Sequence, residues 1–135
     1  MKLVIDTNVL IAAFATHGLC ESVFEIAVSQ HEMFISDHIL GEIRKALQLK
    51  LKVPEKFIEE TIDYLKEYCL LETPLEIPQD VCRDKNDLHI LGLATKVEAD
   101  FIITGDQDLL TLEKFGQTRI VSPRNFWEEL QYEKG

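Results

Sequence analysis

Residues 1–10, MKLVIDTNVL, decide how the rest of the chain is interpreted. Lys2 to Ile5 is a short apolar run with two β-branched residues, which predicts a buried strand. The run ends in Asp6, and apolar residues resume at Val9, where we expect a helix. A buried strand that delivers a carboxylate at its carboxyl end is typical of α/β active sites. The alternative is that Asp6 only caps the following helix.

The size and composition of the chain exclude several classes of protein. Its 135 residues and 46% hydrophobic content fit a single globular domain, residues 1–135. No apolar run approaches the ~20 residues of a membrane span, and the amino terminus lacks the pattern of a signal peptide. Three widely spaced cysteines favour a reducing compartment. We therefore expect a cytoplasmic protein that does not bind membranes.

The net charge of −10 disfavours general nucleic-acid binding, which normally needs a basic surface. It is compatible with a site that is rich in carboxylates and completed by divalent cations. This charge therefore leaves a nucleic-acid substrate open only if cations bridge the protein to phosphate.

Predicted strands and helices alternate along the whole chain. This alternation predicts an α/β domain with a parallel sheet of about five strands and helices on both faces. Asp37 is the expected N-cap of the third helix. The predicted strands are 2–5, 33–35, 70–75, 101–103 and 119–121, and the predicted helices are 9–15, 19–30, 38–51, 55–71, 87–98, 109–114 and 124–132.

Four acids have positions that favour a shared site. Asp6 ends the first strand and Asp106 ends the fourth, and in a doubly wound sheet these two ends are neighbours at the switch point. Asp87 opens the helix before the fourth strand. Glu42 lies on the flank of the apolar stripe of helix 38–51, and Gly41 beside it indicates a close backbone approach.

Each acid also has a structural explanation. Glu42 could pair with Arg44 or Lys45 on its own helix, Asp87 could favour the helix dipole, and Asp106 could cap the next helix. If the acids do gather at one switch point, their repulsion predicts raised pKa values or bound cations. Sites built only from oxygen ligands favour Mg²⁺ or Mn²⁺ over Zn²⁺.

Other catalytic chemistries find little support in the sequence. The chain has no glycine-rich nucleotide-binding motif and no serine in a nucleophile-elbow context. Its histidines show no metal-ligand spacing, and we expect all of them to be surface or packing residues: His17, His31, His38 and His89.

Five segments, in this order, resemble the PIN-domain family, and particularly its toxin-like ribonucleases of VapC type. They are VIDTNVLI (4–11), ISDHILGEI (35–43), RDKNDLHILGLA (83–94), ADFIITGDQDLL (99–110) and IVSPRNFWEEL (120–130). The resemblance covers nearly the whole chain. It implies a three-layer α/β/α fold with a central sheet in the order 3-2-1-4-5, and a metal-dependent endoribonuclease that acts on single-stranded RNA.

The resemblance also implies the residues of the site, position by position. The metal-binding and catalytic acids would be Asp6, Glu42, Asp87 and Asp106, with Asp108 as an auxiliary metal ligand and Thr7, Asn8 and Thr104 in support. Lys85 and Asn86 depart from the family, which often has proline or a further acid there. This departure leaves Asp84 as an alternative to Asp87.

The expected activity is hydrolysis of RNA phosphodiester bonds with one or two Mg²⁺ or Mn²⁺ ions. A basic rim would bind RNA, unless its side chains are simply a solvated face; its members are Arg44, Lys45, Lys50, Lys52, Arg83 and Lys85. The resemblance further implies a toxin of a toxin–antitoxin pair, with a cognate antitoxin, and a homodimer. The alternatives are a non-catalytic interaction module with the same fold, or a small-molecule phosphohydrolase of haloacid-dehalogenase type. The latter needs a second aspartate where this chain has Asn8.

Overall fold

The computed structural model describes the backbone of residues 1–134 and the side chains of residues 1–131. The described residues form one six-stranded sheet in the order β3-β2-β1-β4-β6-β5, in which β5 alone is antiparallel to its neighbour. The predicted fold class and strand order are confirmed, with β6 in the fifth place. The predicted count of about five misses β5. The strands are β1 (Lys2–Ile5), β2 (Glu32–Ile35), β3 (Leu70–Leu71), β4 (Phe101–Ile103), β5 (Lys114–Phe115) and β6 (Thr118–Val121).

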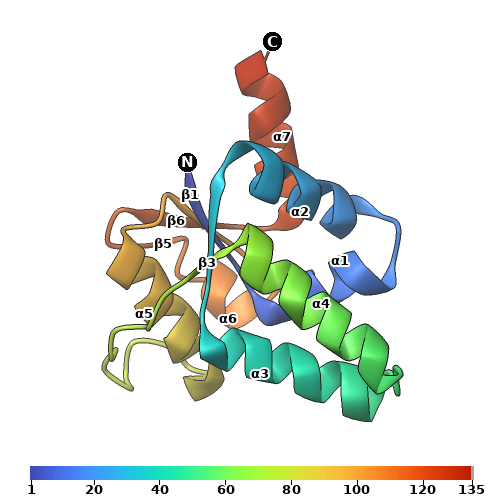
Figure 1. Cartoon of the computed structure of the whole chain (residues 1–135). Coiled ribbons are helices and arrows are strands. Elements are labelled where there is room, and N and C mark those ends of the chain that lie inside the picture. Colours follow the sequence, from blue (N-terminus) through green and yellow to red (C-terminus); the bar gives the residue numbers. More distant parts are fainter. Residues whose placement is uncertain (135) are drawn as a thin grey trace.

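Helices cover both faces of the sheet (Figure 1). One side carries α5, which contacts β1, β2 and β4, and the other carries α2 and α4. No described helix alone is long and apolar enough to cross a membrane, and α1 with α2 meets that test only as a pair bent by 108°. The helices are α1 (Thr7–Ala15), α2 (Leu19–Gln30), α3 (Asp37–Lys45), the π-helical turn η1 (Ala46–Lys50), α4 (Glu55–Tyr68), the 3₁₀ turn η2 (Lys85–Asp87), α5 (Leu88–Val97), α6 (Gln107–Leu110) and α7 (Pro123–Lys134).

Strand β1 lies near the middle of the sheet and sets the position of the site. Its residues Leu3, Val4 and Ile5 are fully buried, as a parallel strand with both faces covered requires. It pairs with β2 on one side and β4 on the other. The carbonyl of Asp6 accepts the first helical hydrogen bonds of α1, from Val9 at 3.0 Å and Leu10 at 3.1 Å. The strand therefore changes directly into a helix at Asp6.

Three sequence predictions of local structure were wrong in detail. Ser36, not Asp37, is the N-cap of α3, because Ser36 keeps an extended backbone and its Oγ accepts from the N–H of Ile39 at 3.1 Å. The predicted strand 70–75 ends at Leu71, ahead of Pro74, which has no N–H for a ladder. The predicted helix 109–114 is replaced by α6, which starts at Gln107 and ends at Leu110, and the chain then enters the β5–β6 hairpin at Lys114.

Gly92 fixes how the segment after β3 lies on α5. The N–H of Leu75 donates to the carbonyl of Gly92 at 3.1 Å. A Cβ at position 92 would lie 2.1 Å from the Leu75 carbonyl oxygen, a distance that no side chain can tolerate. Only glycine therefore allows the two backbones to approach this closely.

Candidate active site

A cleft of about 620 Å³ opens at the carboxyl ends of β1 and β4. Parallel strands place their carboxyl ends at one edge of a sheet, and the pairing of Ile5 with Ile103 aligns these two ends. The residues that line this cleft include most of the acids singled out from the sequence: Asp6, Glu42, Asp84, Asp87 and Asp106.

Three of these acids, Asp6, Asp87 and Asp106, form what we call the acid cluster. One carboxylate oxygen of each lies within 4.8 Å of the others. Asp6 is 8% exposed and Asp87 is 6% exposed, so two of the three carboxylates are buried. The cluster is assembled from the end of β1, the turn η2 and the residue before α6. Residues far apart in the sequence thus meet at the predicted switch point.

Asp84 and Asp108 extend the acid cluster on one side. Their oxygens form a second group of three with Asp87, again within 4.8 Å of one another. Asp84 also caps η2, because its Oδ1 accepts from the N–H of Asn86 at 2.9 Å. The sequence left Asp84 and Asp87 as alternatives, and the structure places both at the site with Asp87 common to the two groups.

Thr104 connects the two strand-end acids. Its hydroxyl donates to Oδ2 of Asp6 at 2.7 Å and accepts from the N–H of Asp106 at 3.0 Å. Asp106 in turn caps α6, since its Oδ1 accepts from the N–H of Asp108 at 2.8 Å. The structural and functional explanations of Asp106 are therefore compatible. Asp6 occupies the N-cap position of α1, but its side chain makes none of the usual side-chain capping hydrogen bonds there, so capping alone does not explain its carboxylate.

Burial and repulsion between neighbouring acids dominate the electrostatics of the acid cluster. Burial raises the pKa of Asp6, and repulsion from Asp106 and Glu42 adds to this, although Thr104 and the backbone of Thr7 act in the opposite direction. Burial and the charge of Asp106 raise the pKa of Asp87 to about 7. Crowded carboxylates with raised pKa values and only oxygen donors fit a divalent cation of the Mg²⁺ or Mn²⁺ type.

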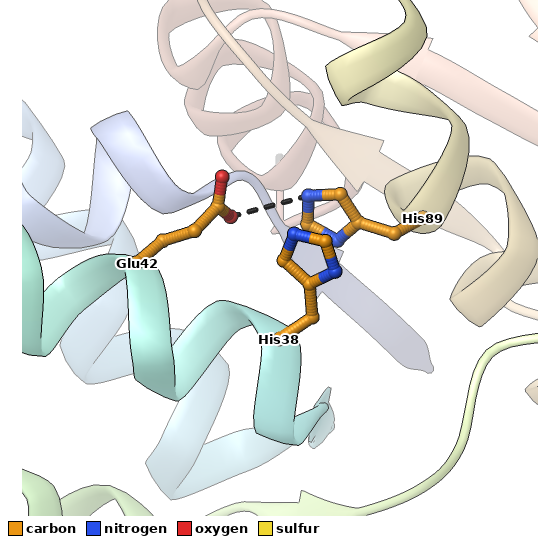
Figure 2. A group of neighbouring side chains, drawn as sticks. All are labelled: His38, Glu42 and His89. Carbon is orange, nitrogen blue, oxygen red and sulfur yellow. Dashed lines mark ion pairs between the residues drawn. The ribbon is translucent and has the colours of Figure 1, made fainter.

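Glu42 lies beside the acid cluster in a different environment (Figure 2). Its Oε1 accepts from the hydroxyl of Thr7 at 2.7 Å and lies 3.1 Å from Nε2 of His89. Burial raises the pKa of Glu42, but hydrogen bonds from His89 and Thr7 outweigh this and lower it overall.

The predicted close approach at Gly41 was wrong, because a Cβ there would meet no described heavy atom within 4 Å.

A comparison with known protein families identifies the family of this chain. A model of the PIN domain matches residues 2–108 of the chain. The chain belongs to the PIN-domain family. Among curated proteins, no sequence matches it.

Two solved structures share the fold of this PIN domain. One is VapBC2 from Rickettsia felis, bound to a DNA fragment from its promoter, with a TM-score of 0.62 and 13% identity over 90% of this chain and 98% of that chain. The other is VapC20 of Mycobacterium tuberculosis, described as a sarcin–ricin-loop-cleaving toxin, with a TM-score of 0.60 and 14% identity over 87% and 98% of the two chains. At this level of identity the similarity establishes the fold.

Two histidines of this PIN domain lie at the cleft although the sequence predicted only surface or packing roles. The rings of His38 and His89 stack with centroids 3.8 Å apart and an angle of 4° between planes, and Figure 2 shows both rings next to Glu42. The spacing of His38 and Glu42, four residues apart on one helix, was a visible signal. His89 was not predictable because it reaches Glu42 only through the packing of α5.

The predicted basic rim is only partly at the cleft. Lys45 lines it, together with Lys50. Arg44 points instead to α4, where its guanidinium binds Glu59 and lies 3.4 Å from Glu55. The remaining members, Lys52, Arg83 and Lys85, are exposed and lie outside the described lining of the cleft. The predicted supporting residue Asn8 belongs to that lining.

Proposed function

We propose that this PIN domain is a metal-dependent endoribonuclease that hydrolyses phosphodiester bonds in single-stranded RNA. The observation that carries the proposal is the acid cluster. Asp6, Asp87 and Asp106 converge within 4.8 Å at an open cleft, and two of them have raised pKa values. A protein gains nothing in stability from such crowding, because like charges held together cost free energy. A role in holding cations explains why the acids are there.

The side chains would divide the work as follows. Asp6, Asp87 and Asp106 hold one or two Mg²⁺ or Mn²⁺ ions, with Asp108 as an auxiliary ligand. Glu42 lines the same cleft and remains the fourth predicted metal-binding and catalytic acid. Thr104 keeps the Asp6 carboxylate oriented through its 2.7 Å hydrogen bond. Bound divalent cations supply a Lewis acid that polarises the scissile phosphate and makes water a better nucleophile.

The wall of the cleft formed by α3 and η1 would bind the RNA chain. Lys45 and Lys50 line it and provide positive charge for phosphates on either side of the cleaved bond. Leu49, on the same wall, is 62% exposed and offers apolar surface to a base. Positive charge on one wall and cations at the acid cluster together offset the negative net charge of the chain.

We also propose that the protein is a toxin with a cognate antitoxin, acts in the cytoplasm and forms a homodimer. The similar fold of the toxin chain in VapBC2 and of VapC20 supports the first of these. Co-purification with the product of an adjacent gene tests the antitoxin, and light scattering on the purified chain tests the dimer. A monomer that co-purifies with no neighbouring gene product would contradict both.

The activity is tested on a panel of single-stranded RNAs with Mn²⁺, Mg²⁺ or a chelator. We expect cleavage with either cation and none with the chelator. Asp6→Asn and Asp106→Asn should abolish it, whereas the exposed Asp80→Asn, which removes the same charge elsewhere, should not. Equal cleavage by the cluster variants would assign the activity to a contaminating nuclease and reject the proposal.

A further inference from the structure

We propose that His38, Glu42 and His89 form a second metal site, for a divalent cation that prefers nitrogen ligands, such as Zn²⁺. We further propose that a cation bound at this second site inhibits the nuclease. The binding of Zn²⁺ is independent of the function proposed above. The inhibition rests on that function. One ligand atom from each of the three side chains lies within 4.8 Å of the others, and two imidazoles with one carboxylate are a donor set typical of Zn²⁺.

The distance between His89 and Glu42 already suits an ion. Zn²⁺ binds imidazole nitrogen and carboxylate oxygen at about 2.0–2.2 Å, so two ligand atoms of a tetrahedral ion are about 3.3–3.5 Å apart. Nε2 of His89 and Oε1 of Glu42 are 3.1 Å apart. An ion therefore replaces the hydrogen between them with a shift of a few tenths of an ångström.

His38 is the ligand that has to move. It is stacked on His89 with parallel ring planes, so the nitrogen lone pairs of the two rings do not converge. The side chain of His89 is only 11% exposed, whereas His38 is exposed and can rotate about its side-chain bonds. Because His38 and Glu42 are four residues apart on α3, they lie on the same face of that helix. Three protein ligands then leave the fourth position of the ion open to water.

The second ring nitrogen of His89 sets the strength of the site. Nδ1 is buried and has no hydrogen-bond partner among the described residues. Metal-binding histidines usually donate this hydrogen to a carboxylate or carbonyl, and loss of such a partner typically weakens binding by about 10–100-fold. We therefore expect a site that fills and empties with the Zn²⁺ concentration and is not permanently loaded.

The two sites in the cleft differ in the metals they prefer. The acid cluster offers only oxygen and suits Mg²⁺ or Mn²⁺, whereas the His38–Glu42–His89 site adds nitrogen and suits Zn²⁺. Glu42 is close enough to Asp6 for its charge to act on the Asp6 carboxylate. A doubly charged ion at Glu42 therefore repels a cation at the acid cluster, and Zn²⁺ should lower the affinity for Mn²⁺.

Zn²⁺ binding is measured first, without RNA, by calorimetry on the full chain, with Co²⁺ as a spectroscopic probe of nitrogen ligation. We expect one Zn²⁺ per chain and a loss of affinity of at least tenfold in both His38→Ala and His89→Ala. The matched control is His17→Ala. His17 pairs with Glu21 at the same four-residue spacing, at 2.9 Å, but no described third ligand joins them.

Cys82→Ser tests the competing site, because the Cys82 thiol lies 4.0 Å from Oδ2 of Asp87. Unaltered Zn²⁺ affinity in both His38→Ala and His89→Ala, or its loss in Cys82→Ser instead, would overturn the proposal. Thermal melting and retained Mn²⁺ binding establish that the variants are folded.

The last measurement is the Zn²⁺ concentration that halves Mn²⁺-supported cleavage, each variant being compared with its own uninhibited rate. We expect this concentration to rise at least tenfold in His38→Ala and to stay unchanged in His17→Ala. If the chain binds Zn²⁺ through its histidines but never cleaves RNA, the nuclease function fails and the site stands. If the chain cleaves RNA but binds no Zn²⁺ through its histidines, the nuclease function stands and the Zn²⁺ site fails.

Discussion

The acid cluster and Glu42 are neighbours in one cleft, yet their carboxylates have pKa values that are shifted in opposite directions. Burial and then like charges raise the pKa of Asp87 and Asp6, whereas hydrogen bonds from His89 and Thr7 lower the pKa of Glu42. Each region contains one threonine hydroxyl 2.7 Å from a carboxylate oxygen. The difference therefore comes from burial, which is deeper for Asp6 and Asp87 than for Glu42, and from the other neighbours: further acids in one region, an imidazole in the other. Carboxylates that line the same cleft need not have the same role.

Among the substitutions that compare the two regions, Asp87→Asn should change the cleavage rate most. It should lower the activity and raise the stability of the metal-free protein. Cleavage should fall by at least ~100-fold because a metal ligand is lost. The metal-free protein should melt higher at pH 8, because asparagine removes a buried, repelled charge. The folded pKa of about 7 exceeds the ordinary 3.8, so the carboxylate costs nothing below about pH 3.8, its cost grows as the pH rises from there through 7, and the cost is constant above that.

The gain in melting temperature on Asp87→Asn should be roughly 3–8 °C at pH 8 and should shrink toward pH 5, by calorimetry. Asp80→Asn, an exposed change of the same type, is the control for net charge. Equal shifts at both pH values would show that Asp87 is not destabilised by ionisation in the folded state.

Thr104→Val and Thr7→Val compare the two supporting hydroxyls directly. Among described side chains, Thr104 is the hydroxyl donor to Asp6. Glu42 has two partners, Thr7 and His89, so it keeps the contact with His89 when Thr7 is replaced. We expect kcat to fall about 10–100-fold in Thr104→Val and less than about tenfold in Thr7→Val. Circular dichroism checks that both variants are folded. A larger loss in Thr7→Val would place the more critical carboxylate at Glu42.

The affinity for Mg²⁺ should increase with pH because Asp87 must lose its proton to bind the ion. With a pKa of about 7, the ionised fraction of Asp87 increases about tenfold between pH 6 and pH 8. Calorimetry should show a similar gain in affinity, and buffers with different ionisation enthalpies should reveal the released proton. An affinity that does not change over this range would mean that Asp87 is already ionised or is not a ligand.

Lys45→Gln and Arg44→Gln should produce the smallest effects and separate two neighbouring cations. Lys45 lines the cleft, whereas Arg44 is bound to acids of α4. Fluorescence anisotropy of labelled RNA is measured in an inactive Asp106→Asn background. Lys45→Gln should weaken binding about two- to fivefold and reduce the slope of log affinity against log salt by about 0.7. Arg44→Gln should change neither the RNA affinity nor the salt slope. A reduced slope in Arg44→Gln would show that Arg44 contacts RNA as the sequence predicted.

The sequence predicted the parts of this molecule that follow from local pattern. β1 and β4 match their predicted bounds because each is an apolar run that ends at a polar residue. The meeting of Asp6 and Asp106 followed from the alternation of strands and helices, which makes the carboxyl ends of their two strands neighbours.

The rest depended on contacts between elements that are distant in the chain. β5 has two residues and exists only through its pairing with β6. Arg44 has cations and acids on its own helix as neighbours, and nothing in the sequence indicates that Glu59 of the next helix binds it. The stacking of His38 on His89 likewise requires α3 and α5 to approach, which no periodicity predicts.

The strands at the two edges of the sheet have a consequence for recognition. β3 and β5 contain two residues each, Leu70–Leu71 and Lys114–Phe115. An incoming peptide that extended the sheet would therefore gain few main-chain hydrogen bonds at either border. The same brevity hinders self-association of the sheet into fibres. The helices and loops of this domain therefore offer a partner more contact surface than the borders of its sheet do.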